Sequence, residues 1–193
     1  PYPSGLNDCY AALSWASHSA DNLLIDRERL GIYGLSAGGG LCAALALLSR
    51  DRNGPPICFQ YLGIPELDDR LNTPSMQNFS DTPIWNQELS KLSWKYYLGN
   101  NYIPGGGNVP FYAAPARADN LRGLPRAYIS TMEFDPLRDE GILYALKLMQ
   151  EGVQTELHSF PGTFHGSHFF SEAKINKRAH EETLRVLKNG LGL

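Results

Sequence analysis

The stretch Gly34-Leu35-Ser36-Ala37-Gly38 lies between an apolar run typical of a buried strand, residues 30–34, and an alanine- and leucine-rich run typical of a helix, residues 37–50. A serine on such a sharp strand-to-helix turn holds its hydroxyl clear of the backbone, and the strained turn requires small neighbours. The G-x-S-x-G pattern alone also arises by chance, so its position between strand and helix gives it weight. We therefore predict that Ser36 is a nucleophile.

The remaining sequence alternates strand-like and helix-like runs. Repeated βα units of this kind build a mostly parallel sheet with helices on both faces, so we predict an α/β fold. A helix is expected over residues 6–20, further strands over 57–62, 126–132 and 155–160, and further helices over 137–151 and 172–188.

An irregular segment, residues 63–124, separates the second and third expected strands. It is punctuated by prolines, and only residues 86–98 look helical. A connection of this length exceeds a simple crossover and often covers a site. We expect a single domain over residues 1–193, with 63–124 as an insertion near the active site. Its aromatic residues could line a pocket, although we expect core packing for most of them: Phe79, Trp85, Trp94, Tyr96 and Tyr97.

Two further polar residues follow strands and could act together with Ser36. Asp135 comes after the third expected strand, and His165 lies in a loop after the fourth. Reactive groups gather at the carboxyl ends of parallel strands. An imidazole can take the serine proton, and a carboxylate can hold the imidazole in the required tautomer. The backbone N–H of Ala37, at a helix N-terminus, would supply one half of an oxyanion hole.

The acid has alternatives in the same segment. Asp135 before Pro136 is also typical of a helix cap followed by proline at the first helical position. Glu133 is the main rival for the acid. Asp139 and Glu140 fall in the first turn of the expected helix, where we expect them to complement its dipole.

The base has one serious alternative among the five histidines. His168 lies three residues from His165 in the same expected loop. His18 and His180 fall on expected helices, and His158 lies inside a strand, where a structural role is expected.

Charge and composition indicate a soluble protein without a charged macromolecular partner. The net charge is −3 and the basic residues are scattered, so the sequence gives no electrostatic reason to expect binding to nucleic acid or to an anionic membrane surface. Lys174, Lys177 and Arg178 are expected to form a solvated helix face. No signal peptide or membrane-spanning run is recognisable, and we expect a cytoplasmic location. A homodimer is left open.

The cysteines and glycines predict no cofactor or metal. Three cysteines without a C-x-x-C pair are typical neither of a disulfide framework nor of a thiolate zinc site, and we expect Cys42 and Cys58 to be buried thiols. Residues 38–43 fit G-x-G-x-x-A, but a dinucleotide site needs an acidic residue at the end of the next strand, and that strand ends Gln60-Tyr61-Leu62.

Taken together, these segments resemble the hormone-sensitive-lipase-like branch of the α/β-hydrolases, which includes bacterial carboxylesterases and relatives of arylacetamide deacetylase. Residues 34–39 resemble the G-D-S-A-G-G elbow of that family, with Leu35 in place of the usual aspartate. Residues 135–141 and 164–166 resemble its acid and base segments. The chain order Ser, Asp, His is that of α/β-hydrolases. The resemblance implies Ser36, Asp135 and His165 as a catalytic triad that acts on short acyl or aryl esters.

One departure from the family concerns the oxyanion hole. The family carries an H-G-G-G motif upstream of the elbow, and the 193 residues contain none. The first strands and cap helices of the family are also missing, and the sequence begins with Pro1 rather than methionine. We therefore expect this chain to resemble the C-terminal part of a hydrolase. Because loss of one oxyanion donor lowers turnover by ~10²–10³, the chain alone is expected to be weak or inactive.

Two function classes follow from the resemblance. The first is a serine carboxylesterase that works through an acyl-enzyme. The second is a non-catalytic receptor for a small molecule, like the plant gibberellin receptors, which resemble this branch but lack the catalytic histidine. The presence of His165 favours the enzyme.

Overall fold

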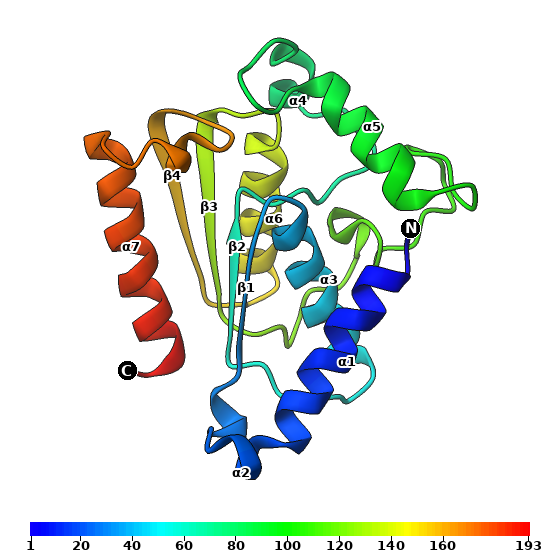
Figure 1. Ribbon diagram of the computed structural model, residues 1–193. Coiled ribbons are helices and arrows are strands. Elements are labelled where there is room, and N and C mark those ends of the chain that lie inside the picture. The colour runs from blue at the N-terminus through cyan, green and yellow to red at the C-terminus, as the bar shows by residue number, and fades with distance from the viewer.

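The computed structural model describes residues 1–193 (Figure 1). Four strands and seven α-helices alternate along the chain, with three short 3₁₀ turns between them. The strands are β1 (Gly31–Leu35), β2 (Phe59–Gly63), β3 (Ala127–Phe134) and β4 (Thr155–Phe164). The helices are α1 (Ser4–His18), α2 (Ala20–Leu23), α3 (Ala37–Asp51), α4 (Pro74–Asn78), α5 (Gln87–Leu98), α6 (Arg138–Gln150) and α7 (Lys174–Leu191).

The four strands form one fully parallel sheet in the order β1-β2-β3-β4. Helices α1, α3 and α6 cover one face, and α7 covers the other (Figure 1). The largest core cluster lies under the first group of helices and includes Leu13, Leu47, Leu62, Ile129 and Tyr144. The predicted α/β fold, with a mostly parallel sheet and helices on both faces, is therefore confirmed.

Helix α3 packs unusually close to the loop that follows β2, and two glycines in its first turn allow this. A Cβ on Gly40 would lie 2.1 Å from the carbonyl oxygen of Glu66, and one on Gly39 would lie 2.9 Å from the Pro65 side chain. Such distances exclude any side chain at these two positions. The loop after β2 is thereby held against the start of α3, directly beside Ser36.

Strand β4 is longer than the sequence predicts, and this changes the place of His165. The strand was expected to end at residue 160, but it continues to Phe164. A register shift in β3 between Met132 and Phe134 lets Phe134 pair with Phe164, and Gly162 supplies a φ of +69° on the way. His165 therefore follows the strand directly instead of lying in a longer loop.

The segment between β2 and β3 carries one helix that the sequence pattern missed. Besides α5, the segment contains the short α4, whose N-cap Thr73 accepts a hydrogen bond from the N–H of Met76, with Pro74 at the first helical position. One turn is too short for a periodic apolar pattern to indicate. Both helices lie beyond the carboxyl ends of the strands (Figure 1).

No helix of the structure combines the length and the apolar character that crossing a membrane requires.

Candidate functional site

Ser36 occupies a strained turn between β1 and α3. Its φ of +57° and ψ of −124° lie where residues other than glycine are rarely found. Three hydrogen bonds hold this conformation. The N–H of Ser36 donates to the carbonyl of Gly63 at 2.8 Å, and its carbonyl accepts from the N–H groups of Gly40 and Glu66, each at 3.1 Å. The backbone therefore projects the hydroxyl away from the sheet.

The two glycines of the G-x-S-x-G pattern differ in the space that the fold leaves for a side chain. A Cβ on Gly34 would lie 2.1 Å from the carbonyl oxygen of Gly38, so Gly34 cannot carry a side chain. A Cβ on Gly38 itself would meet no atom within 4 Å. The turn was expected to require small residues on both sides of the serine. Within this chain that expectation is right for Gly34 and wrong for Gly38.

The structure brings Ser36, Asp135 and His165 into one hydrogen-bonded series. Ser36 Oγ lies 3.0 Å from Nε2 of His165, and Nδ1 of the same ring lies 2.7 Å from Oδ2 of Asp135. Asp135 is fully buried, His165 is 6% exposed, and Ser36 is partly exposed. A hydroxyl with one face open to solvent is thus linked through an imidazole to a carboxylate shielded from water. This arrangement can move a proton away from the hydroxyl.

Asp135 does not occupy the N-cap position predicted for it, because α6 begins at Arg138 with Leu137 as its N-cap and without a capping side chain. Oδ1 of Asp135 instead accepts from the N–H of Leu137 at 2.9 Å, just ahead of the helix, while Oδ2 faces His165. The rival acid, Glu133, points elsewhere: its carboxylate accepts from the N–H of Gly162 at 2.6 Å. Within this short segment, Asp135 therefore contacts His165, whereas Glu133 contacts the backbone of β4.

The expectation for Asp139 and Glu140 needs correction, because neither is only a surface partner of the helix dipole. Asp139 accepts from the N–H of Ser75 at 2.7 Å and so ties α4 to α6. Glu140 is buried and accepts from the N–H groups of Leu67 and Asp68 at 2.5 and 3.2 Å. Burial is the main cause that raises the pKa of Glu140 well above its ordinary value.

Glu66 is a residue of the site that the sequence reasoning missed. Its backbone N–H donates to the carbonyl of Ser36, and its side chain is 6% exposed. Burial raises its pKa to about 7, opposed in part by hydrogen bonding to Ser93 and by the charge of His165. Its signal in the sequence is an acidic residue shortly after a buried strand, and a residue of that kind is also what singled out Asp135.

The segment between β2 and β3 covers the imidazole. The ring of Trp85 lies 5.6 Å from that of His165, centroid to centroid, with the planes tilted by 31°. The other aromatic residues of the segment divide between core and surface. Trp94 is buried in a small cluster with Leu98 and Val109, whereas Tyr96 is 68% exposed.

Ala37 presents an open backbone at the start of α3. It is exposed, and the first helical N–H that bonds back four residues belongs to Gly40, which donates to Ser36. The N–H groups in the first turn of a helix have no acceptor within the helix and attract negative charge. An oxyanion that develops next to Ser36 Oγ therefore has a donor available in the N–H of Ala37.

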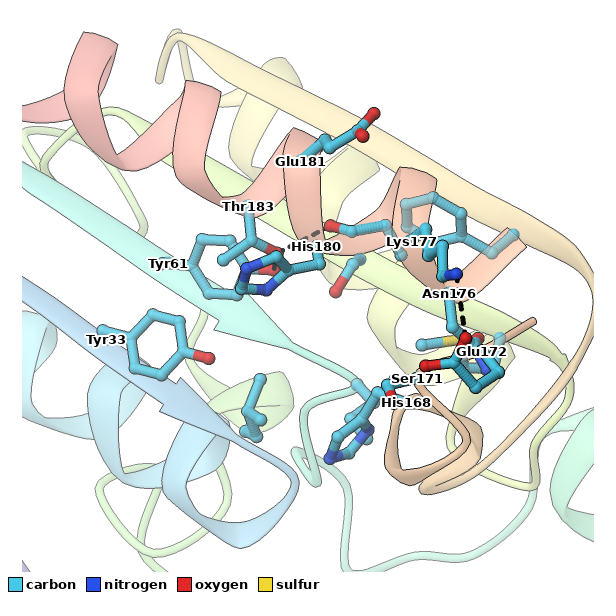
Figure 2. A pocket seen from close by; sticks show the side chains of 16 residues that line it. Tyr33, Tyr61, His168, Ser171, Glu172, Asn176, Lys177, His180, Glu181 and Thr183 are labelled. Carbon is cyan, nitrogen blue, oxygen red and sulfur yellow. Dashed lines mark hydrogen bonds and ion pairs between the residues drawn. The ribbon is translucent and has the colours of Figure 1, made fainter. Parts of the chain in front are cut away.

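His168 lies in a different cavity from the three residues described above. This cavity, of about 510 Å³, lies between α7 and the sheet face that carries Tyr33 and Tyr61 (Figure 2). Neither Ser36, Asp135 nor His165 lines it. Burial, with a smaller contribution from the charge of His165, lowers the pKa of His168. The structure thus brings His165, and not its rival, to the serine.

The remaining histidines occupy the elements expected for them. His18 lies on α1, and His180 lies on α7. His158, in β4, lies 3.3 Å from the Arg178 guanidinium and stacks on Phe160.

The cysteines are free thiols. Cys42 is buried as predicted, and burial raises its pKa to about 12. Cys58 is only partly buried, because it precedes β2 instead of lying within it. No group of histidine, cysteine and carboxylate side chains has an arrangement that could hold a metal ion.

The sequence and the structure both match known proteins. A family described as alpha/beta hydrolase fold matches residues 1–169. Carboxylesterase NlhH of Mycobacterium tuberculosis is 40% identical over 187 residues, which cover 97% of this chain and 58% of NlhH. A solved structure described as bacterial heroin esterase superposes with a TM-score of 0.98 at 54% identity, over 99% of this chain and 61% of that chain. Esterase LipW from Mycobacterium marinum gives a TM-score of 0.90 at 37% identity, over 98% of this chain and 59% of LipW. This chain spans about three fifths of the length of each of these relatives.

Proposed function

Because the chain belongs to the alpha/beta hydrolase fold family, we propose that the protein carrying it is a serine carboxylesterase for short-chain acyl or aryl esters. The family expected from the sequence is thereby confirmed. The similar proteins NlhH and LipW are a carboxylesterase and an esterase by name. The observation that carries the proposal is the hydrogen-bonded series from Ser36 Oγ through His165 to Asp135.

In the proposed reaction, Ser36 Oγ attacks the ester carbonyl carbon while Nε2 of His165 takes the hydroxyl proton. Asp135 keeps the imidazole proton on Nδ1, so that Nε2 is free to accept, and stabilises the imidazolium. The tetrahedral intermediate then expels the alcohol, which leaves with the proton from Nε2. A water molecule, activated by the same nitrogen, attacks the acyl-enzyme and releases the acid.

Charge develops on the carbonyl oxygen during both steps, and the N–H of Ala37 is the donor proposed for it. The 193 residues contain no H-G-G-G motif to supply further donors. Loss of one such donor costs ~10²–10³ in turnover. We therefore expect these residues by themselves to hydrolyse p-nitrophenyl acetate at least a hundredfold more slowly than the same residues joined to an upstream segment that carries the motif.

Covalent labelling tests the nucleophile directly. A fluorophosphonate is expected to label the protein at Ser36, and Ser36→Ala is expected to abolish both labelling and hydrolysis of p-nitrophenyl acetate. Retention of full activity by the Ser36→Ala variant would refute the proposal. A series of p-nitrophenyl esters with increasing acyl length then tests the substrate class, with the short acyl chains expected to be preferred.

The non-catalytic receptor is a weaker candidate on the same fold. The 3.0 Å separation between Ser36 and His165 favours the enzyme, because a binding protein has no use for an imidazole in that place. Tight binding of a small acid without turnover, by protein that also resists the fluorophosphonate, would favour the receptor instead.

A further inference from the structure

Trp85 is presented by a strained turn in the segment between β2 and β3. The N–H of Trp85 donates to the carbonyl of Pro83 at 2.7 Å, which closes a turn of only three residues. Ile84, at the centre of this turn, has a φ of +67°, a conformation that is rare and strained for a β-branched residue. The hydroxyl of Thr82 donates to the carbonyl of Trp85, also at 2.7 Å. The backbone of Trp85 is therefore held at both its N–H and its carbonyl.

Two consecutive residues of this turn lie against the two residues that follow β4. The Ile84 side chain lies beside Gly166, since a Cβ built on that glycine would come within 3.2 and 3.3 Å of two Ile84 carbon atoms. The ring centroids of Trp85 and His165 are 5.6 Å apart, and their planes are tilted by 31°. This separation and tilt fit an offset-stacked pair and not an edge-on one. The indole thus stacks on the imidazole whose Nε2 faces Ser36.

This placement of the indole carries two energetic costs. One is the backbone strain at Ile84, and the other is the indole Nε1, which is buried and has no hydrogen-bond partner. Strained residues persist where the surrounding structure holds them, and they cluster at functional sites. A function for the contact between Trp85 and His165 would account for both costs.

Resting on the esterase function proposed above, we propose that Trp85 is a positioning residue that orients the imidazole of His165 and stabilises its charged form. The proton that leaves Ser36 Oγ moves to Nε2 of His165, so the ring becomes a cation during the reaction. A cation within about 6 Å of an indole ring is attracted to its π electrons, more strongly where water is excluded. His165 is only 6% exposed, so this attraction is little screened. Trp85 acts through His165 and takes no part in the bond changes.

Substitutions at Trp85 test this role through the pH dependence of hydrolysis. Trp85→Leu keeps an apolar side chain beside the imidazole but removes the π electrons, whereas Trp85→Phe keeps a smaller aromatic ring. For p-nitrophenyl acetate, we expect the alkaline plateau of kcat to fall about tenfold in Trp85→Leu and less in Trp85→Phe, with KM nearly unchanged. The pH of half-maximal activity on the acid side should fall by up to about one unit in Trp85→Leu, because the imidazolium is less stable without the indole.

Phe79→Leu is the matched control, because it removes an aromatic ring from the same segment. The partners of the Phe79 ring are Phe134, which meets it edge-on, and the guanidinium of Arg138. This variant should leave the acid side of the pH profile where it lies in the wild type. Circular dichroism of Trp85→Leu and Trp85→Phe checks that both variants fold.

The other titratable groups around His165 stay the same in all of these variants. They are the carboxylate that faces Nδ1 and the two groups whose protonation responds to the charge of the imidazole: Asp135, Glu66 and His168. A shift between the wild type and Trp85→Leu is therefore due to the indole. A lower plateau or a higher KM in Trp85→Leu, without a shift on the acid side, would overturn the inference.

Tryptophan fluorescence without substrate separates this inference from the proposed function. A protonated imidazole quenches the fluorescence of an indole in contact with it more strongly than a neutral one. We expect emission to rise as the imidazole loses its proton, with a component that disappears in both Trp85→Phe and His165→Gln. His18→Gln, three positions from Trp15 on α1, should keep that component. Its absence from the wild type would overturn the inference, whatever the hydrolytic activity. Its presence in a protein that hydrolyses no ester would support the stacked pair and refute the proposed esterase.

Discussion

Oδ2 of Asp135 lies 2.7 Å from Nδ1 of His165, and both side chains are almost completely buried. The other oxygen of Asp135 accepts from the N–H of Leu137. The carboxylate is thus fixed from two sides, by the imidazole and by the start of α6. A buried acceptor in this position sets which ring nitrogen carries the proton, because only a protonated Nδ1 can donate to it.

Asp135→Asn tests this relationship with little change of shape. The asparagine oxygen can still accept from Leu137, which turns its NH₂ group toward His165 and favours the wrong tautomer. We expect kcat for p-nitrophenyl acetate to fall by about 10⁴ while the fold survives. Steady-state kinetics and circular dichroism measure the two effects. Glu133→Gln is the control, and a comparable loss in that variant would mean that the acid has been misassigned.

The turn around Ser36 makes a different prediction for each glycine of the motif. Gly34→Ala places a Cβ 2.1 Å from a backbone oxygen of Gly38, which no rotamer can relieve. We expect this variant to lose at least about 3 kcal/mol of unfolding free energy, or to fail to fold. Gly38→Ala meets no atom and lies in the first turn of α3, so it should be neutral or stabilising by up to ~1 kcal/mol. Urea denaturation measures the unfolding free energy of both variants. Equal losses in Gly34→Ala and Gly38→Ala would contradict the steric argument.

Much of this architecture could be predicted from the sequence because the strands are short, buried and separated by clear turns. Ser36, Asp135 and His165 could be predicted for the same reason: each follows a strand, and parallel strands bring their carboxyl ends to one edge. The end of β4 could not be predicted. Pro161-Gly162 is typical of a turn, and its continuation as a strand depends on the register shift in β3, which only the paired structure shows.

The burial of Glu140 could not be predicted from the sequence either. An acidic residue in a helix's first turn is usually at the surface, and nothing local distinguishes Glu140 from Asp139. The loop after β2 buries Glu140. The N–H groups of Leu67 and Asp68 in that loop donate to its carboxylate, although they lie more than 70 residues away in the sequence. Local patterns indicate the elements, but they carry no information on contacts at that separation.

The segment between β2 and β3 is anchored by a buried ion pair that can be tested for stability. Arg117 binds both carboxylate oxygens of Asp69, at 2.5 and 2.9 Å, and the Asp69 side chain is fully buried. Arg117→Ala would leave that carboxylate buried without its countercharge. We expect a loss of about 3–5 kcal/mol in unfolding free energy. Arg122→Ala, which breaks the exposed pair with Glu151, should cost no more than ~1 kcal/mol. Denaturant-induced unfolding of the two variants measures both losses of unfolding free energy. A loss in Arg117→Ala as small as that in Arg122→Ala would show that other groups stabilise the Asp69 carboxylate.

Glu66 makes the stability of the folded protein depend on pH. Its pKa is about 7 in the fold against an ordinary value of 4.5, because burial penalises the charged form. Between these values the folded state binds more protons than the unfolded state, so stability falls as pH rises. The contribution is fully present below pH 4.5 and is lost as pH passes 7. The difference amounts to roughly 3 kcal/mol between the two limits.

Glu66→Gln removes this titration while keeping the shape of the side chain. Relative to the wild type, the variant is therefore expected to gain stability as pH rises from 4.5 to 8, by up to roughly 3 kcal/mol. Chemical denaturation at half-unit pH intervals measures the difference curve. Glu88→Gln removes the same charge from the exposed face of α5 and controls for net charge. Oε1 of Glu66 has no hydrogen-bond partner in the structure. A flat difference curve for Glu66→Gln would mean that this oxygen gains a partner in solution, since hydrogen bonds to the charged carboxylate would keep its pKa near the ordinary value.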